Sequence, residues 1–216
     1  GLPNNVLCYG SMRCRTQGPN NNFTSGAISS LVAIGSALRN FQRERIDFAI
    51  VGGYGYPSDQ FLRGAQQIAQ EKTADSAIFC SLETRASAEK RNNKSLASIS
   101  AVASFTVPGR EGQKPEQAAS AMEKVIEMLC KKTEQKPEEI DAVFIPGDGP
   151  TLELSKIVSD KLSMSKTSWL QLDGYLGDMK EASGLVELIY AATNTKFREN
   201  RKTRGPLDTV AVIRSG

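Results

Sequence analysis

The side chains in this sequence that could carry chemistry are carboxylates, lysines, hydroxyls and four thiols, because its 216 residues contain no histidine. Histidine is the usual proton shuttle near neutral pH and the commonest metal ligand in proteins. Its absence excludes a Ser-His-Asp triad, a Cys-His dyad and a histidine-bound zinc site. An enzyme built from this chain would need another acid-base group or a borrowed cofactor. Chance loss of a scarce residue is the alternative explanation.

The four cysteines do not form a recognisable metal or redox motif. They are Cys8, Cys14, Cys80 and Cys130, and no two of them are spaced as CxxC. We therefore expect no metal site. Cys80 lies in an apolar run and Cys130 on the apolar side of a predicted helix, so both are interpreted as core residues. A reducing, cytoplasmic setting is the simplest inference, and a Cys8–Cys14 disulfide remains an alternative.

Composition is that of an ordinary globular protein, with 39% hydrophobic and 24% charged residues. The formal net charge of +3 is too small to indicate a nucleic-acid partner. No apolar run approaches the roughly 18 to 20 residues that cross a bilayer, so no membrane association is expected. The first ten residues have neither the basic region nor the apolar core of a secretory signal.

Hydrophobic periodicity predicts alternating strands and helices, which is typical of α/β layering. The predicted strands cover 20–25, 46–51, 76–82, 95–107, 141–145, 168–172 and 207–213. The predicted helices cover 28–45, 59–71, 115–132, 151–163 and 180–195.

Three segments resemble a known family, in the same order. Residues 18–31 (GPNNNFTSGAISSL) run into a helix and then into a strand that ends in Gly-Gly. They resemble the nucleophile segment of β-ketoacyl synthases, which have the thiolase fold. Residues 137–150 (PEEIDAVFIPGDGP) are similar to the strand that carries the first active-site histidine of that family. Residues 172–184 (LDGYLGDMKEASG) resemble its Lys-x-x-x-Gly-His segment.

The positions that carry catalysis in the family are occupied here by other residues. The resemblance places the nucleophilic cysteine at Ala27, the first histidine at Pro146 and the second histidine at Asp178. The lysine of the third segment falls on Asp173. A methyl group cannot attack a thioester, and proline is neither a donor nor a base. The resemblance therefore predicts a fold that has lost its Cys/His/His chemistry, and we expect no catalytic residue at these positions.

The resemblance implies an α/β fold of the thiolase type, a layered αβαβα arrangement with mixed sheets. It is partial, because the family has well over a hundred residues before the nucleophile turn that have no counterpart here. We expect residues 1–110 to be a remnant of the N-terminal half and residues 111–216 to form the C-terminal half. The missing strands are expected on another polypeptide, or the chain is a fragment or a short form.

The function implied is that of an accessory or structural subunit in fatty-acid or polyketide-type synthesis, similar to a chain-length factor. Gly26, Ala27, Gly147 and Gly177 would then line an acyl ligand, and no cofactor is expected. Strand 20–25 is expected at the interface of a homodimer or of a heterodimer with an active ketosynthase. A cluster of basic residues is the candidate surface for an acidic acyl carrier protein, or else a solvated tail; its members are Lys196, Arg198, Arg201, Lys202 and Arg204.

Two other functions stay open. A serine near the turn could act as a substitute nucleophile for thioester hydrolysis or decarboxylation, although no base is evident near Ser25, and Ser29 and Ser30 are expected to bond to their own backbone. Asp173 and Asp178 could form an acid-base pair, although solvated loop charges are the simpler interpretation. The chain could also be a homo-oligomeric binding module for an acyl or CoA-like ligand.

Overall fold

The computed structural model describes residues 5–55, 74–106, 115–145, 149–193 and 210–212. The helices are α1 (Asn5–Cys14), α2 (Ser29–Gln42), α4 (Arg85–Lys90), α5 (Pro115–Thr133), α6 (Gly149–Lys161), α7 (Asp173–Leu176) and α8 (Ser183–Thr193). Two 3₁₀ turns are η1 (Pro137–Glu139) and η2 (Lys180–Ala182). The strands are β1 (Phe48–Gly55), β2 (Ser76–Glu83), β3 (Ala142–Phe144), β4 (Ser168–Leu170) and β5 (Val210–Val212).

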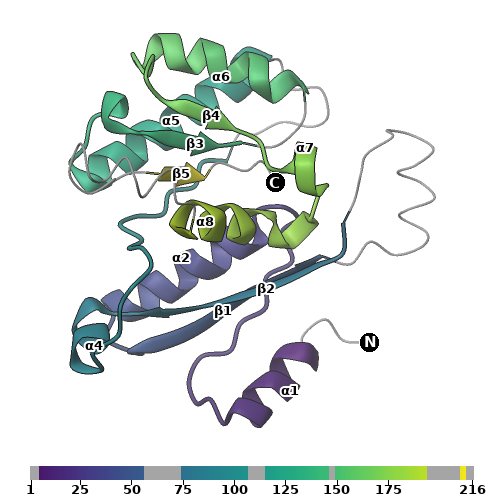
Figure 1. The fold of residues 1–216 in the computed structure, drawn as a ribbon, viewed down its shortest axis with the longest axis vertical. Helices are drawn as coiled ribbons and strands as arrows, with labels where there is room; N and C mark the ends of the chain where they lie inside the picture. Colours follow the sequence, from purple (N-terminus) through teal and green to yellow (C-terminus); the bar gives the residue numbers. More distant parts are fainter. Residues whose placement is uncertain (1–4, 56–73, 107–114, 146–148, 194–209, 213–216) are drawn as a thin grey trace.

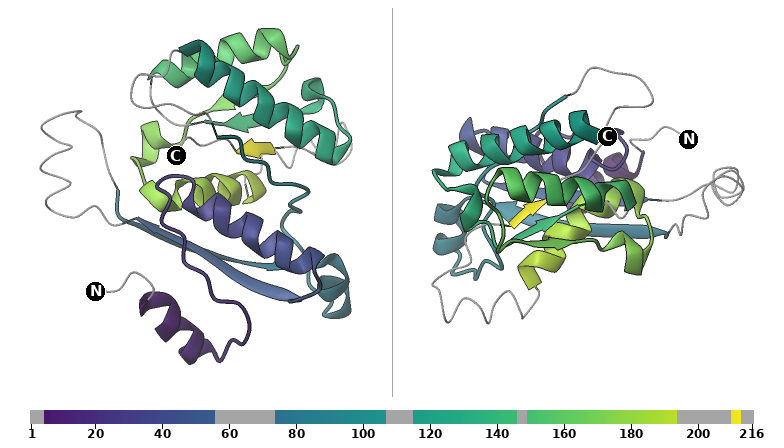
Figure 2. Two further views of the ribbon diagram at one scale, coloured as in Figure 1. Left: turned by 180° about the vertical axis from the view of Figure 1, so that it is seen from behind. Right: turned by 90° about the horizontal axis from the view of Figure 1, so that it is seen from above.

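These elements stack as alternating helical and sheet layers. Figure 1 shows, from top to bottom, α5 and α6, the sheet of β3, β4 and β5, the helices α8 and α2, and the β1–β2 hairpin. The view from behind in Figure 2 shows the same order. Helix α1 lies beyond the hairpin in both views. The predicted α/β layering is therefore confirmed.

The upper sheet has three parallel strands in the order β4-β3-β5. All three residues of β3 are buried, as expected for a central strand covered on both faces. Helix α5 has its apolar residues at the helical period and places them on one stripe. The core formed here consists of Ala119, Met122, Ile126, Cys130, Ile140, Val143, Ile145, Leu154, Val158 and Met164.

The lower sheet is an antiparallel pair in which Val51 lies opposite Cys80. Every second residue of β1 faces α2, α8 or the loop at η2, so buried and exposed positions alternate along the strand. Ile34, Ala37, Val51 and Leu185 form the buried centre of a second core. Helix α8 therefore contributes, through Leu185, to the same core as α2 and β1. The predicted division of the chain at residue 110 stays a prediction.

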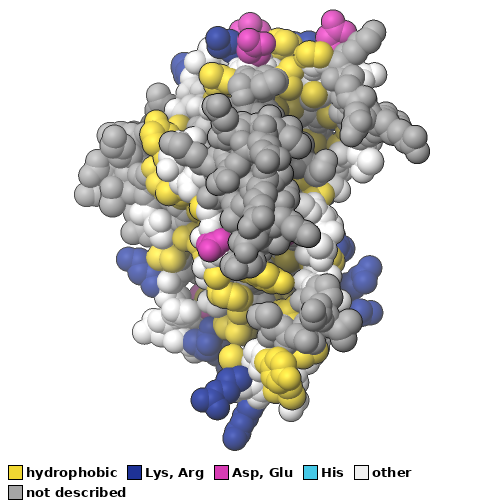
Figure 3. All heavy atoms as spheres, turned by 90° about the vertical axis from the view of Figure 1, so that its right-hand side faces the viewer, with side chains coloured by type: hydrophobic (Ala, Val, Ile, Leu, Met, Phe, Trp, Pro, Cys, Tyr) yellow, Lys and Arg dark blue, Asp and Glu magenta, His cyan; other side chains and the backbone are white. Residues whose placement is uncertain are grey.

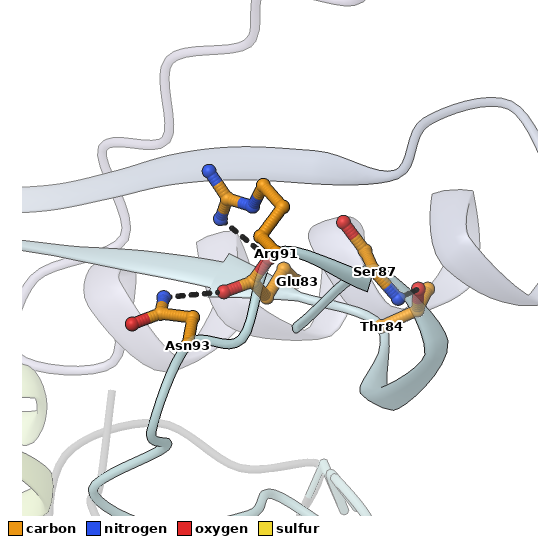
Figure 4. A network of polar contacts seen from close by, with 5 residues as sticks. All are labelled: Glu83, Thr84, Ser87, Arg91 and Asn93. Carbon is orange, nitrogen blue, oxygen red and sulfur yellow. Dashed lines mark hydrogen bonds and ion pairs between the residues drawn. The ribbon is translucent and has the colours of Figure 1, made fainter. Parts of the chain in front are cut away.

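A polar network fastens the end of the hairpin nearest α4. The Glu83 carboxylate at the end of β2 accepts hydrogen bonds from Arg91 at 2.5 Å and from Asn93 at 2.9 Å (Figure 4). These bonds, that of Arg91 foremost, hold the pKa of Glu83 below its usual range. Thr84 begins α4 as its N-cap, because its hydroxyl accepts a hydrogen bond from the Ser87 N–H (Figure 4).

Two predicted strands are absent. Residues 20–24 form no strand, and Ser25 and Ala27 make only an isolated bridge. Asn20, Asn21 and Asn22 are exposed, and asparagine is depleted in strands. No strand of the described residues pairs with this segment, so its backbone has no ladder to join. The expected dimer contact of this segment stays a prediction.

The second absent strand, predicted at 95–107, is an extended crossing segment over its described residues 95–106. It leads from the end of α4 toward α5. The Val102 carbonyl accepts a hydrogen bond from the Lys132 ammonium at 2.6 Å, and a Cβ placed on Gly35 of α2 would lie 3.4 Å from the Val102 side chain. The Lys124 ammonium lies 4.7 Å from the centre of the Phe105 ring. Interactions with two helices take the place of strand pairing.

The other strands and helices predicted from the sequence are confirmed wherever they fall within the described residues. The predicted strands 46–51, 76–82, 141–145, 168–172 and 207–213 correspond to β1 to β5, with boundaries that shift by a few residues. The predicted helices 28–45, 115–132, 151–163 and 180–195 correspond to α2, α5, α6 and η2 with α8. The helix predicted at 59–71 lies outside the described residues, and α1 was not predicted. Within the described ranges, no helix is both long and apolar enough to cross a membrane.

All four thiols are free, so the alternative of a Cys8–Cys14 disulfide is not seen. Burial raises the pKa of the Cys80 thiol. The pKa of the Cys130 thiol is also raised, chiefly by burial and next by the nearby carboxylates of Glu139, Glu138 and Glu127.

We expect iodoacetamide to modify two thiols of the native protein quickly and two slowly. Cys8 and Cys14 are exposed, whereas a raised pKa lowers the thiolate fraction of Cys80 and Cys130 and burial limits access to them. Mass spectrometry of timed samples should show rates that differ by at least about tenfold. Unfolding in urea should abolish the difference, and four equal rates in the native protein would contradict the packing described here.

Candidate functional site

The candidate site begins at a turn that leads into α2. Gly26 has a φ of +60°, the left-handed region that favours glycine. The Ser29 hydroxyl closes the turn, because it donates to the Gly26 carbonyl and accepts from the Ser25 N–H, both at 2.7 Å. Ala27 is half-buried and lies two residues before Ser29, the first residue of α2. The methyl group of Ala27 therefore sits beside a helix N-terminus, where a thiol would have a lowered pKa.

Helix α2 is joined directly to the start of α8. The Ser30 hydroxyl is buried and accepts a hydrogen bond from the Leu185 N–H at 3.1 Å, across a sequence separation of 155 residues. The Ser30 hydroxyl thereby gives a partner to the Leu185 N–H, one of the backbone donors in the first turn of α8 that have no partner within the helix. A side chain at the N-cap of a helix usually fills this role. A Cβ added to Gly184 would lie 2.8 Å from Leu31 Cγ, so the two helices touch where glycine leaves room. Such a cap is worth about 1 kcal/mol.

Asp178 is held in place by its neighbour Lys180. Its carboxylate accepts the Lys180 backbone N–H at 2.8 Å and forms an ion pair with the ammonium at 2.5 Å. Its backbone carbonyl accepts the Ala74 N–H at 3.1 Å. Gly177 is buried with a φ of +85°, a conformation that other residues rarely adopt. Asp178 is therefore a half-buried, paired carboxylate that orders the loop before η2.

The hairpin presses its backbone onto this loop. A Cβ on Gly53 would lie 2.9 Å from the Cα of Ala182, and one on Gly55 would lie 2.3 Å from the Met179 carbonyl oxygen. The Ser76 hydroxyl also donates to the Met179 carbonyl, at 3.2 Å. Only glycine permits this approach, which accounts for Gly53, the second residue of the Gly-Gly pair, and for Gly55. Gly52 faces the Phe79 ring instead, and β1 continues past the pair to Gly55.

The structure thus brings two of the three resembling segments together. Residues 178–185 contact the hairpin at Gly53 and Gly55 and the first turn of α2 at Ser30 and Leu31. Asp173 is the first residue of α7 and is half-buried. Pro146 and Gly147 lie outside the described residues, as do the basic residues Lys196, Arg198, Arg201, Lys202 and Arg204. The roles expected of all these residues stay predictions.

Sequence reasoning missed two side chains that shape the site. Ser30 was expected to bond to its own helix, and it bonds to Leu185 instead, whereas Ser29 does bond to its own turn. Lys180 was not singled out, although an ammonium two residues after a loop aspartate is within reach of that carboxylate. Within the described part of the chain, no three acidic or thiol side chains are grouped so that they could hold a metal ion.

No protein-family model and no curated protein matches the sequence. Solved structures do match the fold. The ishigamide ketosynthase/chain length factor superimposes with a TM-score of 0.78 and 17% identity, over 99% of this chain and 58% of that chain. A β-ketoacyl synthase from Burkholderia phymatum STM815 gives a TM-score of 0.77 and 16% identity, over 92% of this chain and 53% of that one.

A third match is a type II polyketide synthase acyl carrier protein in complex with its ketosynthase, with a TM-score of 0.72 and 18% identity over 89% of this chain. The chain spans 53–58% of the length of these three structures. The chain therefore has the ketosynthase, thiolase-like fold, over part of the length of those proteins. Identities of this size show the fold and leave the activity to be proposed.

We expect Gly55→Ala to destabilise the protein by about 1–3 kcal/mol, because its Cβ would meet the fixed Met179 backbone. Gly174→Ala is the matched control, since nothing lies within 4 Å of a Cβ at that position of α7. The control should be neutral or slightly stabilising, because alanine favours helix. Urea unfolding followed by circular dichroism measures both. Equal effects would show that the hairpin is not pressed onto residues 179–182.

Proposed function

We propose that this protein is a catalytically silent ketosynthase-like subunit that serves polyketide or fatty-acid-type synthesis as an accessory or structural partner. The observation that carries the proposal is the methyl group of Ala27 at the N-terminus of α2. The turn has the features that activate a nucleophile: a left-handed glycine, a serine-closed loop and a helix dipole. At position 27 itself it presents only a methyl group, which has no atom that can attack a thioester.

The ion pair at the position of the second histidine supports the same proposal. In the resembled family, histidines hold the enolate oxygen that develops when malonyl thioester loses carbon dioxide. A carboxylate such as that of Asp178 would repel this oxyanion. Its pairing with Lys180 gives it a structural role in the loop instead.

The partners we propose are an active ketosynthase and an acyl carrier protein. Support comes from the names of two matched structures, one a ketosynthase/chain length factor and one a ketosynthase with its acyl carrier protein. The basic cluster that begins at Lys196 has the charge that suits an acidic carrier. Gly26, Ala27, Gly147 and Gly177 would leave room for an acyl chain. Free thiols agree with the proposed cytoplasmic location.

The proposal is tested by incubating the purified protein with malonyl and acyl thioesters of CoA and of acyl carrier protein. We expect no covalent adduct on the intact protein by mass spectrometry and no release of free thiol or carbon dioxide. Turnover that disappears in Ser25→Ala or Asp178→Asn would instead identify an enzyme with altered chemistry. Condensation by the protein alone would overturn the proposal, and co-purification with a ketosynthase would distinguish it from a simple acyl-binding module.

Ala27→Cys should restore acyl loading if only the nucleophile has been lost. The new thiolate would attack the thioester carbonyl, and the CoA thiol would leave. We expect the acyl mass to appear on position 27 at least about tenfold faster than in the matched control Ser25→Cys, which lies further from the helix N-terminus. Both changes are made in a Cys8→Ser, Cys14→Ser background, because those two thiols are exposed. Equal loading would mean that the turn gives no activation.

A further inference from the structure

We draw no further inference here: the strongest candidate, the apolar outer face of the β1–β2 hairpin with the exposed side chains of Phe48, Ile50 and Phe79, in the lower part of the molecule where Figure 3 shows hydrophobic side chains at the surface, carries none because nothing in the described residues shows what covers it.

Discussion

The fold depends on the close contact between the backbone of the hairpin and the loop that precedes α8. Gly53 and Gly55 let β1 reach Ala182 and Met179 without intervening side chains. From the other side, Ser30 reaches the first turn of α8 and Gly184 makes room for Leu31. The segment 178–185 is thereby held between two elements that are far away in the sequence.

This contact explains how the turn holds its geometry with a methyl group at position 27. The turn is the start of α2, and α2 is fixed to α8 by the Ser30 bond and by apolar packing. Its shape is therefore maintained by the core, whichever side chain stands at position 27. The loss of chemistry proposed above is compatible with retention of the fold, because different residues are responsible for each.

Much of the fold could be predicted from the sequence, for identifiable reasons. Helix α5 has a clear 3.6-residue period and a proline at its start, and β3 is a short apolar run between turn signals. These are local signals. The resemblance on three segments pointed to the ketosynthase fold, and the structural matches agree with it.

The predictions that were wrong or missed concern segments whose structure depends on residues far away in the sequence. Residues 20–25 were expected to form a strand at a dimer interface, and the described residues of the single chain offer no strand to pair with, so Asn20, Asn21 and Asn22 stay exposed and unpaired in a ladder. Residues 95–106 alternate small and apolar side chains as a strand does, but their neighbours are helices. The bond from Ser30 to Leu185 spans 155 residues and has no local signature. A single sequence carries no information about such contacts.

The crossing segment has a mechanical consequence for the two layers that it links. Val102 touches α2 through its side chain at Gly35 and α5 through its carbonyl at Lys132. One residue therefore works as a spacer between helices that belong to different cores. The segment thus bridges the helical layer above the upper sheet and the helical layer above the hairpin through a single residue.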